Sequence, residues 1–187
     1  MPEGLLLTPG AGTDRNQATL LALEEALAPL PVARVDFPYR KEGRKAPDRA
    51  PKLIASLVAD AEAFVAEQGI SPDRLVLGGR SMGGRMCSMA VAQGLPAAGL
   101  VLICYPLHPP KKPENLRVDH FGDLAVPCLF ISGTRDPFGT PEELEHHTST
   151  IVGPVTHHWI EGGRHDLKGA DHEICEVVGA WIRGLGS

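Results

Sequence analysis

Short, unbroken apolar segments alternate with helix-like segments along the chain, and this alternation limits the fold more than any other feature of the sequence. The apolar segments mostly lack polar alternation, which is typical of strands that are buried on both faces of a sheet. They lie at residues 4–8, 31–36, 74–78, 99–105, 126–132 and 155–160. We expect these segments to form a compact, mostly parallel sheet of about six strands.

The segments between the predicted strands carry apolar residues at helical spacing. The clearest begins at Pro51, ends before Gly69 and places Ile54, Leu57 and Val58 on one face. Helices are predicted at residues 17–28, 51–68, 81–93 and 171–183, with a short acidic piece at 141–147. This order predicts an α/β fold with helices on both faces of the sheet. Because ligands bind at the carboxyl ends of parallel strands, functional residues are expected in the loops that follow the strands.

Length and composition favour a single domain over residues 1–187 and disfavour several classes of function. The formal net charge of −5 makes nucleic acid or an anionic membrane surface a poor partner. No apolar stretch approaches the roughly 18 residues of a membrane span, and the first residues do not resemble a signal peptide. The four cysteines are widely spaced without a CxxC pair, so free thiols and a cytoplasmic location are expected. No metal site and no cofactor are predicted.

One motif carries chemistry. Residues 79–83, Gly-Arg-Ser-Met-Gly, fit the pattern G-x-S-x-G and lie between a predicted strand and a predicted helix. In this pattern the serine occupies a sharp turn, and the glycines avoid collisions with neighbouring elements. The turn raises the hydroxyl above the sheet and directs the N-terminus of the next helix toward the reaction centre, where that helix end favours negative charge. Ser81 is therefore the predicted nucleophile, and a glycine-rich turn with an incidental serine is the alternative.

A serine hydroxyl needs a base, and with this motif the partners follow in the order Ser, Asp or Glu, His. Asp136 closely follows the predicted strand 126–132 and is the predicted acid, whereas Asp119 and Asp123 precede that strand. His165 lies in a glycine-rich loop between the last predicted strand and the last helix, and it is the predicted base. Each residue alone has an alternative as a turn or surface residue. Together they occupy the three roles in the right order at the right strand ends.

An oxyanion hole needs two backbone N–H donors. The residue after the nucleophile, Met82, is expected to supply one of them. The other is expected from the loop 8–13 after the first strand, with Ala11 as the first choice and Gly10 as the alternative. The alternative is a plain glycine turn before a helix, which has the same sequence pattern.

Three further features are candidate substrate contacts. Arg80 flanks the predicted nucleophile and would contact a substrate carboxylate or form a structural ion pair. His108 follows the predicted strand 99–105 and would line the pocket or lie in a loop between prolines. The basic segment 39–45 would attract an anionic substrate or form a solvated loop.

Three stretches carry a resemblance to known proteins: GGRSMGGR at residues 78–85, YPLHPP at 105–110 and LFISGTRDPFG at 129–139. They resemble the small hydrolase-like family that includes a testis-expressed hydrolase-like protein and a regulatory subunit of a histone acetyltransferase complex. More loosely, the chain is similar to dienelactone hydrolases. The resemblance spans essentially the whole chain. It implies the α/β-hydrolase fold, with nucleophile, acid and base at Ser81, Asp136 and His165.

The chain departs from these relatives at two places. Most hydrolases have His-Gly in the oxyanion loop, where this sequence has Pro9 and Gly10. Dienelactone hydrolases would carry a cysteine at the position of Ser81, so their substrate is not implied here. The segment 107–123, where many hydrolases insert a lid, is too short for a helical cap domain, which predicts an open site.

These observations predict a serine hydrolase that cleaves a small ester or thioester, a small-molecule acyl substrate, through an acyl-enzyme. One alternative is a non-catalytic hydrolase-like protein that serves as a binding or scaffold module, because fold does not imply function. Another is an enzyme that transfers the acyl group to an acceptor other than water. The sequence leaves the acyl group, the leaving group and the oligomeric state open.

Overall fold

A six-stranded sheet forms the centre of the molecule, and all neighbouring strands in it are parallel. The computed structural model describes residues 1–186. The strands are β1 (Gly4–Thr8), β2 (Val32–Arg34), β3 (Leu75–Arg80), β4 (Gly99–Ile103), β5 (Cys128–Gly133) and β6 (Val155–Ile160). Their order across the sheet is β2-β1-β3-β4-β5-β6. The prediction of a parallel sheet of about six strands is confirmed, with small differences at the strand ends.

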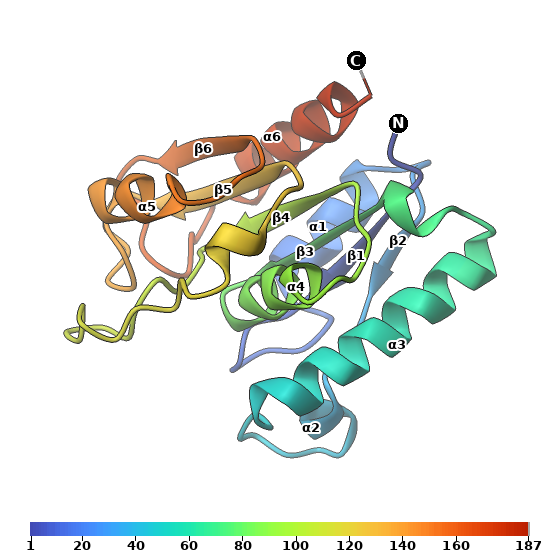
Figure 1. The fold of residues 1–187 in the computed structure, drawn as a ribbon, viewed down its shortest axis with the longest axis horizontal. Helices are drawn as coiled ribbons and strands as arrows, with labels where there is room; N and C mark the ends of the chain where they lie inside the picture. Colours follow the sequence, from blue (N-terminus) through green and yellow to red (C-terminus); the bar gives the residue numbers. More distant parts are fainter. Residues whose placement is uncertain (187) are drawn as a thin grey trace.

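Helices cover both faces of this sheet, as predicted. They are α1 (Ala18–Ala26), α2 (Pro38–Lys41), α3 (Ala50–Gln68), α4 (Met82–Ala92), α5 (Pro141–Thr148) and α6 (Asp171–Gly184). In Figure 1, α3 and α4 lie in front of the sheet, and α1 and α6 lie behind it. The two faces therefore have separate cores: Leu6 and Leu77 pack toward the α3–α4 side, and Leu5 and Val76 toward the α1–α6 side. Burial on both faces is the physical reason for the unbroken apolar runs.

The basic segment 39–45 differs from the loop that the sequence suggested. Its first residues form the short helix α2, which Pro38 begins in a position where proline's missing N–H costs nothing. Tyr39 in this helix is fully buried. Two of its basic side chains form surface ion pairs: Lys41 lies 3.2 Å from Asp60, and Arg44 lies 3.0 Å from Asp48. These ion pairs favour a solvated surface over an anion-binding loop.

The connection from β4 to β5 holds no cap domain, as expected from its length. Within it the structure forms only a 3₁₀ turn, Phe121–Asp123. The yellow-green part of this connection extends away from the body of the molecule in Figure 1. None of the helices in residues 1–186 combines the length and the apolar composition that crossing a bilayer requires.

The winding of the chain creates a crevice between the ends of β1 and β3. From β1 the chain moves to β2 on one side, whereas β3 and all later strands lie on the other side. The loops that leave β1 and β3 consequently diverge. Open α/β sheets bind ligands at such a switch point, beyond the carboxyl ends of the strands.

A half-buried histidine near the α3–α4 face gives the fold a pH dependence. The Nε2 atom of His120 lies 2.8 Å from the hydroxyl of Ser88, which in turn donates a hydrogen bond to the carbonyl of Arg85. The ring also meets Phe121 edge-on. Burial, assisted by the nearby Arg85 charge, lowers the pKa of His120 from 6.5 to about 4.

We expect acid to destabilise the fold through His120. Between pH 6.5 and about 4 the unfolded chain binds this proton and the native chain does not, so the free energy of unfolding falls as pH is lowered. His120→Gln removes the titrating group and should therefore reduce the acid-induced loss of unfolding free energy. The reduction should be roughly 1–3 kcal/mol, limited by the partial exposure of the ring to solvent. Urea denaturation near pH 7 and about pH 4.5 measures it. The control is His172→Gln, which changes a histidine whose side chain is 88% exposed. Equal acid-induced losses in the two variants would contradict the expectation.

Candidate active site

Ser81 occupies a strained turn between β3 and α4. Its backbone has φ 50° and ψ −116°, a conformation that residues other than glycine rarely adopt. Such a conformation costs roughly 1–3 kcal/mol and persists only where the surroundings impose it. The Ser81 N–H donates a hydrogen bond of 2.8 Å to the carbonyl of Ile103 at the end of β4, which holds the turn on the sheet. Helix α4 begins at the next residue, so its N-terminus faces the serine.

The two glycines of the motif are required by contact with the end of β1. A Cβ atom on Gly83 would lie 2.6 Å from the carbonyl oxygen of Pro9, and one on Gly79 would lie 2.7 Å from the backbone nitrogen of Gly84. Real Cβ contacts essentially never come this close. The Thr8 hydroxyl, which both Cβ atoms would also meet, donates to the carbonyl of Gly78 at 3.1 Å. The absent side chains therefore let β1, β3 and α4 approach closely enough to form the crevice.

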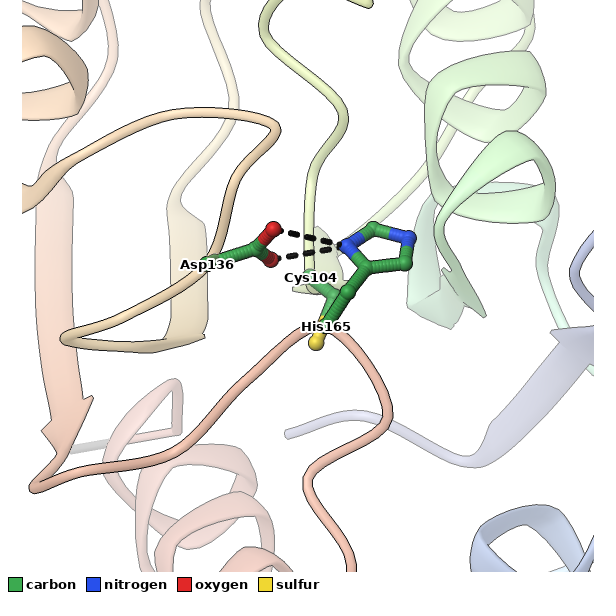
Figure 2. A group of neighbouring side chains, drawn as sticks. All are labelled: Cys104, Asp136 and His165. Atoms are coloured by element: carbon green, nitrogen blue, oxygen red, sulfur yellow. Dashed lines mark hydrogen bonds and ion pairs between the residues drawn. The ribbon is translucent and has the colours of Figure 1, made fainter. Parts of the chain in front are cut away.

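The structure brings the three predicted catalytic side chains together in one chain of hydrogen bonds. The Nε2 atom of His165 lies 2.9 Å from the Ser81 hydroxyl oxygen. Its Nδ1 atom lies 2.8 and 3.0 Å from the two carboxylate oxygens of Asp136, and Figure 2 shows this pair. An ionised carboxylate only accepts hydrogen bonds, so it favours the tautomer with the proton on Nδ1 and leaves Nε2 free to accept from the serine. Asp136 is 4% exposed.

Phe138 supports both members of the Asp136–His165 pair, a role that the sequence analysis did not assign. Its backbone N–H donates a hydrogen bond of 2.9 Å to an oxygen of Asp136. Its ring stacks on the imidazole of His165, with the ring centres 4.0 Å apart and the planes at 28°. The backbone contact is a local turn of the kind that aspartate forms two residues before its donor, which the sequence Asp-Pro-Phe indicates. The ring contact depends on the loop that carries His165, and no sequence signal reveals it.

Close packing of two glycines sets the distance between the acid and the base. Gly133 ends β5, and a Cβ atom on it would lie 2.9 Å from the Cα atom of Gly163. Next to this contact, the Arg135 N–H donates to the carbonyl of Gly163 at 2.9 Å. The loop before α6 therefore lies directly on the loop that carries Asp136.

The loop after β1 presents the predicted second oxyanion donor. The carbonyl of Gly10 accepts hydrogen bonds from both the backbone N–H and the hydroxyl of Thr13, each at 3.2 Å. Because a trans peptide holds C=O and N–H in opposite directions, the Ala11 N–H points away from Thr13. The buried Tyr39 hydroxyl donates to the Ala11 carbonyl at 2.8 Å and holds the next peptide. Tyr39 was not singled out in the sequence. Within residues 1–186 neither the Ala11 N–H nor the Met82 N–H has a hydrogen-bond acceptor.

A cavity of about 690 Å³ opens above Ser81 and His165. Its walls come from the loop after β1, the first turn of α1 and the loop before α6. One wall is polar, formed by Thr13, Gln17 and Thr19, and Phe138 and Leu167 contribute apolar surface. Gly10, Ala11, Arg80 and Asp171 also line it.

Comparisons with known proteins identify the family of the chain. Residues 2–176 match the family model described as an alpha/beta hydrolase domain. The chain belongs to the alpha/beta hydrolase family. The coarse resemblance inferred from the sequence is thereby confirmed, and the narrower likeness to the testis-expressed and acetyltransferase-subunit group stays a prediction.

Solved structures of several other proteins share this fold at low sequence identity. Est1E from Butyrivibrio proteoclasticus superimposes with a TM-score of 0.77 at 14% identity, over 98% of this chain and 89% of Est1E. An alpha-beta serine hydrolase homologue from Coxiella burnetii gives a TM-score of 0.75 at 17% identity, over 95% and 84%. A structure of the metagenome-derived lipolytic enzymes LipS and LipT gives 0.77 at 18%, over 97% and 93%. At these identities the likeness shows the fold.

His108 does not line the cavity, which corrects the expectation from the sequence. Its side chain is only 6% exposed, with Nδ1 2.9 Å from the carbonyl of Pro109 and Nε2 3.4 Å from a carboxylate oxygen of Glu143. The contact with Glu143 directs the ring toward α5, and the His108 backbone N–H donates to the carbonyl of Phe138 at 3.1 Å. It therefore supports the loop behind the cavity.

Arg80 does line the cavity, but the expected structural ion pair is absent. Within residues 1–186 no ion pair includes its guanidinium, which is held by neutral oxygens. Asp166 lines the same cavity, yet it forms no ion pair with Arg80. Arg80 is 8% exposed, so the charge lies beneath the cavity surface.

Cys104 lies beneath the Asp136–His165 pair, and the three residues together resemble a metal-binding set (Figure 2). One ligand atom from each lies within 4.8 Å of the other two. The Nδ1 atom and the carboxylate are, however, bound to each other, and the thiol is fully buried. Burial raises the pKa of Cys104 to about 12, so the sulfur is a protonated packing group. Cys87 on α4 is likewise buried and not a nucleophile, with its pKa raised to about 12.

We expect Gly83→Ala to lower both the stability of the fold and the reactivity of Ser81. The new Cβ would meet Thr8 and Pro9 and push the oxyanion loop away from α4. Overpacking of this kind costs about 1–3 kcal/mol or more. The thermal midpoint and the rate of serine labelling are the measurements. Gly122→Ala is the matched control, because nothing lies within 4 Å of a Cβ there. A stable, fully reactive Gly83→Ala protein would contradict the expected contact.

Proposed function

We propose that the protein is a serine hydrolase that cleaves a small ester or thioester. The observation that carries the proposal is the chain of hydrogen bonds from Asp136 through His165 to Ser81, at 2.8 and 2.9 Å, on the wall of an open cavity. A nucleophile, a base within hydrogen-bond reach of it and a buried acid that orients the base are the parts that acyl transfer needs. Membership of the alpha/beta hydrolase family supports the same reaction class.

In the first half of the reaction Ser81 attacks the acyl carbon of the substrate. As its oxygen forms the new bond, the hydroxyl proton moves to Nε2 of His165, and Asp136 stabilises the resulting imidazolium. The negative charge on the former carbonyl oxygen is stabilised by the N–H groups of Met82 and Ala11. The bond to the leaving oxygen or sulfur then breaks, and His165 returns its proton to the leaving group. The product of this half is an acyl-enzyme on Ser81.

In the second half His165 removes a proton from water, and the oxygen attacks the acyl-enzyme. The bond to Ser81 breaks, the serine regains its proton and the acid leaves. Another acceptor in place of water would make the enzyme an acyltransferase. The two are separated by adding a small alcohol or amine and measuring how the acyl group is partitioned between it and water.

The cavity favours short acyl groups. The lack of a cap domain leaves the site open, so a long chain would extend into solvent beyond the apolar surface that Phe138 and Leu167 provide. Thr13, Gln17 and Thr19 line the opposite part of the cavity with polar groups. A small-molecule acyl substrate that is short or carries polar groups fits this wall.

We expect p-nitrophenyl acetate and butyrate to be cleaved with kcat/KM values roughly tenfold or more above those for octanoate and palmitate. The physical reason is that methylenes beyond the mouth of the uncapped cavity stay in water and gain no buried contact. Thioesters of the same acids and one small thiol provide a second series with a different leaving group. A specificity constant that rises with chain length would reject the proposed substrate class.

We expect a fluorophosphonate to label the protein once, on Ser81. The Ser81 oxygen forms a bond to phosphorus, the bond to fluorine breaks, fluoride leaves, and the proton passes to His165. Intact mass measures the adduct, and the reagent does not depend on the natural substrate.

Two variants make the labelling diagnostic. Ser81→Ala should give no adduct, and Asp136→Asn should slow labelling by roughly 100-fold or more, because the amide no longer favours the reactive tautomer of His165. No adduct on folded parent protein would reject the serine-hydrolase proposal and favour a binding module.

A further inference from the structure

Arg80 carries a buried charge next to the nucleophile, and the mechanism above gives it no part. The residue is the last of β3 and directly precedes Ser81. A buried guanidinium is costly unless its N–H groups are bonded. In the described part of the chain its hydrogen bonds go to neutral oxygens. A charge that is costly to bury and lies next to the nucleophile indicates a function for Arg80.

One side of the guanidinium holds the main chain of the predicted base. Nη2 of Arg80 donates a hydrogen bond of 2.6 Å to the backbone carbonyl of His165, a short contact typical of a charged donor. The loop around His165 is irregular, with positive φ at Gly162, Leu167 and Gly169. Such a loop has no strand or helix ladder to fix it. The bond from Arg80 fixes it at the residue that matters for catalysis.

The other side of the guanidinium is anchored on α1 and α6. In the amide orientation that satisfies both groups, the side-chain oxygen of Gln17 accepts from Nη1 and Nε of Arg80 at 3.0 and 3.1 Å. Nη1 also lies 3.4 Å from the Thr19 hydroxyl, which donates to Asp171 at 2.7 Å. The carboxylate of Asp171 thus balances the charge across one hydroxyl. With most of its donors taken, the guanidinium has little capacity left to hold a substrate carboxylate.

We propose that Arg80 is a positioning residue that sets the distance between His165 and Ser81. The inference rests on the proposed serine-hydrolase function. Arg80 and Ser81 are joined by a peptide bond, His165 bonds to the Ser81 hydroxyl through its ring, and its carbonyl bonds back to Arg80, so the three residues form a closed circuit. Asp136 fixes the imidazole ring and Arg80 fixes the main chain that carries it. Without Arg80 the base moves relative to the nucleophile.

The test compares Arg80→Gln, Arg80→Lys and the parent protein in fluorophosphonate labelling. Both the rate and the final number of adducts per chain are measured, together with kcat and KM for p-nitrophenyl butyrate. Arg80→Gln should still reach one adduct per chain but label roughly 10- to 100-fold more slowly, with kcat lowered far more than KM. Arg80→Lys should lie between, because one ammonium cannot span both His165 and Gln17. Arg164→Gln removes an exposed arginine beside His165 and should label at the parent rate.

The outcomes separate positioning from a general loss of structure. A parent rate on a reduced fraction of Arg80→Gln molecules would mean that Arg80 only stabilises the fold, and it would overturn the inference. A parent rate on all molecules would overturn it as well. If Arg80→Gln does not fold, Arg80→Lys decides, and labelling of that variant at the parent rate overturns the inference. Failure to label the parent protein is a distinct result, which removes the proposed function and this inference with it.

Discussion

The site depends on how closely the end of β1 approaches the start of α4. Glycines at positions 79 and 83 leave no side chain where Thr8 and Pro9 pass, and this contact fixes the two loops that diverge at the switch point of the sheet. The strained turn at Ser81 is stable only because β3, β4 and α4 hold it from three sides. The packing that stabilises the fold therefore also fixes the position of the Ser81 hydroxyl group. A chain that lacked this close packing would still form a sheet, but without the crevice.

Around that hydroxyl, the polar groups are oriented mostly by main-chain contacts. Phe138 directs Asp136 through its backbone N–H, Thr13 directs the Ala11 peptide through the Gly10 carbonyl, and Tyr39 holds the peptide after it. Such contacts cost little reorganisation when charge develops, which is the property that transition-state stabilisation requires. Burial strengthens the contacts of Asp136, because buried Cys104 and the stacked ring of Phe138 limit the access of water to this side of the pair, while His165 faces the cavity.

The sequence was informative wherever a local rule coincided with the fold. Unbroken apolar runs predict the sheet. The positions of Asp136 and His165 after strand ends predict that both lie at the same edge of it. Contacts between distant segments leave no local pattern. The sequence therefore places Tyr39 in a basic loop, assigns no role to Phe138 and predicts His108 in the cavity that it does not line. For Arg80 the sequence offers a substrate carboxylate or a structural ion pair. Within residues 1–186 its guanidinium forms no ion pair and meets carbonyl, amide and hydroxyl oxygens, and the substrate contact stays a prediction. The catalytic roles, the cytoplasmic location and a small-molecule partner stay predictions, because no contact within the chain reports on them.

The connection between β4 and β5 has a further consequence for what the cavity selects. Because this connection forms no cap, the space above Ser81 is bounded on its sides and open toward solvent. Selection then acts on the part of a molecule that enters between the loop after β1 and the loop before α6. The part that remains outside is free in size and shape. The described residues place no cap over Ser81, so the side walls of the cavity are what limits the portion of a substrate that reaches the serine.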